Sequence, residues 1–129
     1  METTGTVAIY PEQDLTQKIL EAAFALHNVL GCGFLEKVYA NPLLLELRTM
    51  GLSRESEVNF RVNYRNAIVG DYCADLIVER RGLIELKACK GLEPIHEAQI
   101  LNYLKASGIR VGLLMNFGKP RLEYRRFVR

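Results

Sequence analysis

The hydrophobic pattern changes its period near residue 57, and this change limits the fold more than any other feature of the sequence. Before it, apolar residues recur every three or four positions, which is typical of helices. From Glu57 to Tyr64, apolar and polar residues alternate, which predicts a half-buried strand. The next segments, 67–79 and 82–89, are rich in β-branched and apolar residues, as expected of central strands that are covered on both faces.

Three helices and two further strands complete the predicted order. The first helix covers 14–30 with Asp14 as its N-cap, and the second runs from about 34 to 50. We expect a kink or a break near Asn41, because Pro42 removes an amide donor and clashes with the preceding turn. A third helix at 93–108 and strands at 110–117 and 122–128 follow. The order is helix, helix, strand, strand, strand, helix, strand, strand.

Length and composition limit the class of protein. A chain of 129 residues, 49% hydrophobic and 25% charged, can bury one ordinary core, which predicts a single α/β domain over 1–129 with a polar lead at 1–12. A net charge of +2 neither requires nor excludes a polyanionic partner. The three cysteines form no Cys-x-x-Cys pair, and no signal peptide or long apolar run is present. We therefore expect a cytoplasmic protein without a membrane segment.

An acid and a base lie two residues apart in the apolar run LIELKACK, residues 83–90. In a strand, Glu85 and Lys87 project from the same face. A turn centred near Arg80 or Arg81 sets Asp75 opposite one of them. Two carboxylates this close repel unless a cation lies between them, and oxygen ligands favour Mg²⁺ or Mn²⁺. A structural ion-pair network on the sheet face remains the alternative.

Further polar residues lie on the predicted helices. His96, Gln99 and Tyr103 share one face of the third helix, because they are spaced by three and four residues. Glu36 lies near the start of the second helix. Taken alone, Glu36 is also compatible with a solvated helix carboxylate, and His96 or Tyr103 with a hydrogen-bonded packing residue.

Four sequence blocks resemble a known family. GFLEKVY, read as Gly33-x-x-Glu36-x-x-Tyr39, is similar to the signature of the GxxExxY family, and GDYCADLIV, IELKA and HEAQILNYL resemble its later blocks in the same order. The resemblance covers residues 14–128. That family is similar to the PD-(D/E)xK nuclease superfamily, which implies an α/β (α+β) fold with a restriction-endonuclease-like core, a mixed central sheet flanked by helices.

The resemblance also implies roles for individual residues. Asp75 corresponds to the superfamily aspartate, although Ala74 stands where many members have proline. Glu85 and Lys87 correspond to the E-x-K pair, and Glu36 to the acidic residue of the first core helix. Gln99 and Tyr103 match a Gln-xxx-Tyr pair found in many nucleases of this fold.

These roles predict a magnesium-dependent nuclease that hydrolyses DNA or RNA. Asp75, Glu85 and Glu36 would hold Mg²⁺ or Mn²⁺, while Lys87, Glu36 and Gln99 would be catalytic. A symmetric homodimer is expected if so small a nuclease spans a duplex. The alternatives are a catalytically silent nucleic-acid-binding or adaptor module with the same fold, and a purely structural subunit of a larger complex.

Positive charge gathers in the last eleven residues. Strand alternation places Arg121 and Arg125 on one face there, which predicts nonspecific phosphate contacts. With Tyr103 and His96, these two arginines make up the predicted nucleic-acid-binding set. The alternative is that this is an edge strand whose charged side chains prevent it from pairing with a strand of another molecule.

Overall fold

The computed structural model describes residues 11–129, and its helices and strands follow the predicted order. The elements are α1 (Gln13–Leu30), α2 (Glu36–Thr49), β1 (Arg54–Tyr64), β2 (Ala67–Val78), β3 (Gly82–Lys87), α3 (Pro94–Ser107), β4 (Val111–Asn116) and β5 (Glu123–Val128). The strands form one mixed sheet in the order β1-β2-β3-β4-β5. Only β3 and β4 run parallel, and α3 connects them.

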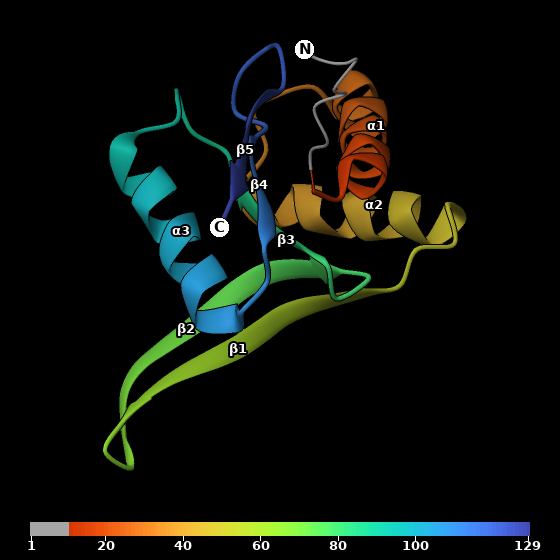
Figure 1. The fold of residues 1–129 in the computed structure, drawn as a ribbon. Coiled ribbons are helices and arrows are strands. Elements are labelled where there is room, and N and C mark those ends of the chain that lie inside the picture. Colours follow the sequence, from red (N-terminus) through yellow and green to blue (C-terminus); the bar gives the residue numbers. More distant parts are fainter. Residues whose placement is uncertain (1–10) are drawn as a thin grey trace, which may run out of the picture.

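Helices cover both faces of the sheet. In Figure 1, α1 and α2 lie on one side of the sheet and α3 lies on the other. Each side has its own apolar cluster, one packed against α1 and α2 and one against α3. Every residue of β4 is buried, as expected of a central strand that is covered from both sides. None of the helices within residues 11–129 has the length and apolar character that crossing a membrane requires.

Two details of the predicted helices are wrong. The N-cap of α1 is Glu12, because the Thr16 amide already donates to the Glu12 carbonyl at 2.9 Å; Asp14 lies in the first turn. Helix α2 runs through Pro42 without the expected break. The proline deprives the Val38 carbonyl of its helical donor, but Val38 lies on the exposed side, where water can satisfy that carbonyl.

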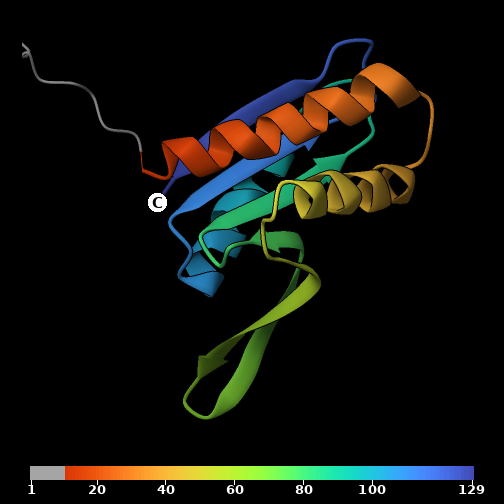
Figure 2. The same ribbon diagram turned by 90° about the vertical axis from the view of Figure 1, so that its right-hand side faces the viewer.

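The outer halves of β1 and β2 form a hairpin arm, residues 59–72, that projects from the rest of the molecule (Figures 1 and 2). Tyr64, Ile68 and Val69 are exposed near its tip. The prediction that the whole of 67–79 is covered on both faces is therefore wrong, since continuous burial begins only near Ala74. Apolar composition predicted the strand but not which half of it lies over a helix.

Candidate active site

Asp75 and Glu85 meet where β2 and β3 separate. The regular pairing of these strands ends at Leu76 and Ile84, which sets Asp75 beside Glu85 as predicted. The Asp75 amide donates to Glu85 Oε2 at 2.8 Å, and the Leu86 amide donates to Asp75 Oδ2 at 2.8 Å. Each carboxyl group thus replaces a hydrogen bond between the strands. Each keeps a second oxygen, Asp75 Oδ1 and Glu85 Oε1, that accepts no assigned hydrogen bond from residues 11–129.

The other side of β2 is also irregular at this point. The register with β1 passes from Ser56 opposite Leu76 to Val58 opposite Ala74, and the intervening Glu57 has a positive φ of 53°. A left-handed conformation at a glutamate departs from regular strand geometry. Asp75 therefore lies where the pairing with β3 has ended and beside an irregular backbone at Glu57, although the register with β1 is the same on both sides of Glu57.

Burial and mutual repulsion make the carboxyl groups difficult to ionise together. Glu85 is only 3% exposed, and this burial, together with the nearby Asp75 charge, raises its pKa to about 8. Burial also raises the pKa of Asp75, against the opposing effects of the Leu86 amide and the Lys87 ammonium. The pKa of Glu36 is raised by burial and then by the Asp75 charge. Full ionisation of this cluster near neutral pH is therefore unfavourable, and an added cation would favour it.

Lys87 is connected to helix α3 by a chain of hydrogen bonds. Its Nζ donates to Gln99 Oε1 at 3.0 Å, and Gln99 Nε2 donates to the Tyr103 hydroxyl at 3.0 Å. Burial, followed by the charge of Glu85, raises the pKa of Tyr103. The predicted association of Gln99 and Tyr103 on one helical face is confirmed, and Gln99 holds the lysine beside the carboxyl groups.

The motif of Gly33, Glu36 and Tyr39 spans the loop before α2 and the first turn of that helix. Tyr39 is fully buried, and its hydroxyl donates to the Gly31 carbonyl at 2.7 Å and accepts from the Phe34 amide at 3.3 Å. Gly33 has a φ of 111°, which favours glycine. Tyr39 thereby fixes the loop that leads into the helix, and Glu36 is the first residue of that helix.

Glu36 and Asp75 line one cavity of about 150 Å³ between α2 and the sheet, together with Glu57 and Leu86. No group of three or more His, Cys, Asp or Glu side chains within residues 11–129 forms a preassembled metal site. Asp75 and Glu85 nonetheless supply the kind of ligand that suits Mg²⁺, because this ion keeps several waters and takes one or two carboxylates. Glu36 as a ligand stays a prediction.

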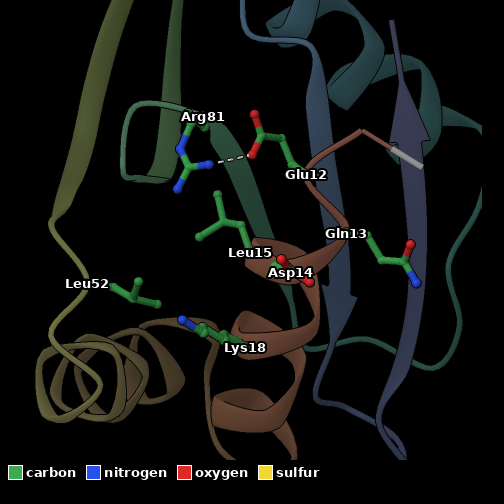
Figure 3. Close-up of a pocket in the computed structure, with 7 residues that line it drawn as sticks. All are labelled: Glu12, Gln13, Asp14, Leu15, Lys18, Leu52 and Arg81. Carbon is green, nitrogen blue, oxygen red and sulfur yellow. Dashed lines mark hydrogen bonds and ion pairs between the residues drawn. The ribbon is translucent and has the colours of Figure 1, made fainter. Parts of the chain in front are cut away.

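A larger cavity, of about 550 Å³, lies at the opposite end of β3 (Figure 3). The start of α1, Leu52 and Arg81 line it. Arg81 is paired with Glu12 at 2.7 Å, and Asp14 and Lys18 add one charge of each sign. None of the residues that line it within 11–129 belongs to the carboxyl cluster, so we do not place the active site there.

The remaining predicted residues are more scattered. His96 Nδ1 accepts the Glu93 amide at 3.0 Å and so caps α3, although the ring also lines a groove beside Gln99. Arg125 forms an ion pair with Glu97 of α3. Arg121 is exposed before the start of β5.

Helix α3 partly covers the face of β5 that carries Arg125. Phe127 packs against the apolar cluster below α3, and Glu123, on the same face, binds Asn116. Phosphate contacts of Arg121 and Arg125 stay a prediction.

Asn116 is a residue of the site region that we did not predict. It is fully buried at the end of β4, opposite Lys87 in the parallel register. Its Oδ1 accepts the Cys89 amide at 2.9 Å, and its Nδ2 donates to the Cys89 carbonyl and to Glu123 Oε1, both at 3.0 Å. A Cβ at Gly118 would lie 2.4 Å from the Cys89 backbone. Asn116 therefore fixes the backbone that follows Lys87. The sequence feature that could have predicted this role is an asparagine within the apolar run VGLLMNF.

Comparisons with known proteins identify the fold and the superfamily. The crystal structure of SSO0001 has a TM-score of 0.58 and 21% sequence identity to this chain and covers 91% of it. The chain spans 58% of the length of that protein, and at this identity the likeness shows the fold alone. No curated protein matches the chain significantly. The family model of the PD-(D/E)XK nuclease superfamily matches residues 13–127, and the chain therefore belongs to this superfamily.

Proposed function

We propose that the chain is a metal-dependent nuclease that hydrolyses phosphodiester bonds of DNA or RNA. The observation that carries the proposal is the pair of facing carboxyl groups, Asp75 and Glu85, with Lys87 beside them at the point where β2 and β3 separate. Membership of a nuclease superfamily supports the same chemistry. The closer assignment to the GxxExxY family rests on Gly33, Glu36 and Tyr39 and is part of the proposal.

The free oxygens of Asp75 and Glu85 would hold Mg²⁺ or Mn²⁺, and Glu36 would approach the same ion directly or through a water. With a divalent ion held by these residues, the site would supply a coordinated water of lowered pKa and positive charge to offset the negative charge that develops on the phosphate. The same positive charge would also make it easier to ionise the buried Glu85.

Lys87 supplies a fixed positive charge beside the carboxyl groups. Gln99 Oε1 accepts a hydrogen bond from the ammonium and limits its movement, and Tyr103 in turn orients the Gln99 amide. The ammonium would hold the attacking water in line and offset charge on the phosphate while the bond to the leaving oxygen breaks. Gln99 and Tyr103 act here through Lys87 as positioning residues.

A cleavage assay tests this proposal. Labelled single- and double-stranded DNA and RNA are incubated with the protein in Mg²⁺, in Mn²⁺ and in EDTA. We expect cleavage that requires the metal and that falls about 10²- to 10⁴-fold in Lys87→Ala, because a preorganised charge at the reacting phosphate is lost. Lys90→Ala is the matched control, since Lys90 is exposed three residues further along the chain and should leave the rate unchanged.

Two results would contradict the proposal. Binding of nucleic acid without metal and without any cleavage that depends on Lys87 would identify a catalytically silent binding module. Absence of nucleic-acid binding at moderate salt would favour a structural subunit, because phosphate contacts dominate such binding.

A further inference from the structure

A groove of about 470 Å³ lies between α3 and the inner end of the hairpin arm. Its lining includes residues of β2 and of one face of α3, among them Tyr72, Ile95, His96, Gln99, Asn102 and Tyr103. Gln99 also binds Lys87, so the groove begins directly beside the candidate active site. Its volume is within the range of small-molecule sites and is large enough for a nucleobase with its sugar.

Two aromatic rings, Tyr72 of β2 and Tyr103 of α3, lie side by side in the groove. The rings of Tyr72 and Tyr103 have centroids 5.3 Å apart at an angle of 58°. Tyr103 is only 8% exposed and supports Tyr72 from inside the fold, whereas Tyr72 keeps part of its surface exposed. Such a ring offers a rigid apolar surface against which a flat ligand can stack.

Helix α3 also supplies polar groups to the groove. Asn102 is exposed there and offers both a donor and an acceptor. His96 is fixed by the Glu93 amide at Nδ1, so that Nε2 is the nitrogen left for a ligand. Ile95 adds an apolar surface that is 71% exposed. Carboxylates are absent from the described residues that line the groove, in contrast to the neighbouring metal site.

We propose that this groove binds an unpaired nucleobase of the strand that is cleaved at Asp75 and Glu85. An aromatic ring beside amide and imidazole groups is the combination with which proteins bind splayed bases of single strands. A base inside an intact duplex cannot stack on Tyr72, because its faces are covered by its neighbours. The inference rests on the proposed nuclease function and adds its substrate class: single-stranded or locally opened nucleic acid.

Binding measurements in an Asp75→Asn background test the inference without turnover. Fluorescence anisotropy compares a labelled single-stranded oligonucleotide with the blunt duplex of the same sequence. We expect Tyr72→Leu to weaken single-strand binding about tenfold and Tyr72→Phe to preserve it, because stacking needs the ring and not the hydroxyl. Asn102→Ala changes only an exposed side chain and should weaken single-strand binding about two- to tenfold through one lost hydrogen bond.

Tyr64→Leu is the matched control, since Tyr64 is an exposed tyrosine near the tip of the same arm. Duplex affinity should be unchanged in all four variants. If neither Tyr72→Leu nor Asn102→Ala changes the affinity for the single strand, the groove proposal is overturned. The nuclease proposal is not affected by that result. An equal loss of duplex affinity in Tyr72→Leu, or an equal loss of single-strand affinity in Tyr64→Leu, would also overturn the groove proposal. If the Asp75→Asn protein binds neither oligonucleotide, the groove proposal fails, whereas the cleavage assay on the wild-type protein decides the nuclease proposal.

Discussion

Glu85→Gln is expected to be more stable than the wild-type protein at pH 8 in EDTA, by roughly 2 to 5 kcal/mol. Burial and the neighbouring Asp75 raise the pKa of Glu85 to about 8, so the metal-free protein either keeps an extra proton or buries a charge there. Glutamine fills a similar volume, can accept the Asp75 amide with its oxygen and carries no charge. The same variant should lose cleavage, because it removes a proposed metal ligand.

The direction of the pH effect follows from proton binding. Between pH 4.5, the ordinary pKa of the carboxyl group, and about 8, the unfolded chain has released the proton of Glu85 while the folded protein still binds it. The free energy of unfolding therefore falls as the pH rises through this window. The raised pKa values of Asp75 and Glu36 act in the same direction.

Urea unfolding in EDTA at several pH values measures this effect. The difference between Glu85→Gln and wild type should grow from pH 5 to pH 8. Glu21→Gln is the control, since Glu21 is an exposed carboxylate of α1. The free energy of unfolding of this variant should depend on pH in the same way as that of the wild type. Parallel pH profiles for Glu85→Gln and wild type would show that Glu85 ionises without cost in the folded protein.

Tyr39→Ala is expected to destabilise the protein by about 3 to 5 kcal/mol, as other deletions of a buried aromatic side chain do. Tyr39 is fully buried and stacks on Phe117 with ring centroids 4.8 Å apart. Its hydroxyl also binds the Gly31 carbonyl and the Phe34 amide, so Tyr39→Phe should cost about 1 to 2 kcal/mol while keeping the stacking.

Chemical unfolding of the two variants separates packing from hydrogen bonding. Tyr64→Ala, a change at an exposed position of the arm, should alter the free energy of unfolding by less than about 0.5 kcal/mol. Cleavage by Tyr39→Phe should also decrease, because the loop that it releases leads directly to Glu36. A loss below about 1 kcal/mol in Tyr39→Ala would contradict the anchoring role.

The carboxyl and lysine cluster could be predicted because short-range geometry determines it. The turn at residues 80–81 places Asp75 opposite Glu85, and strand alternation adds Lys87 to the same face. Helical spacing similarly brings Gln99 next to Tyr103. These relations hold within a hairpin or a helix and need no knowledge of the rest of the fold.

Features that depend on contacts between distant segments could not be predicted. Alternation showed which residues of β5 share a face, but not that α3 partly covers that face and pairs Glu97 with Arg125. The same limit applies to the arm, whose apolar residues resemble those of a central strand. Proline propensity likewise predicted a break at Pro42, whereas burial of Leu43 and Leu47 holds α2 against the sheet.

A crystal soaked in Mn²⁺ tests the central claim most directly, through the anomalous scattering of the ion. We predict a peak about 2.0 to 2.2 Å from Asp75 Oδ1 and Glu85 Oε1, the oxygens that the backbone amides leave free, with Glu36 within reach directly or through one water. The peak should disappear in Asp75→Asn. A soaked crystal without a peak between Asp75 and Glu85, or with manganese bound only elsewhere, would contradict a metal-dependent nuclease centred on this pair.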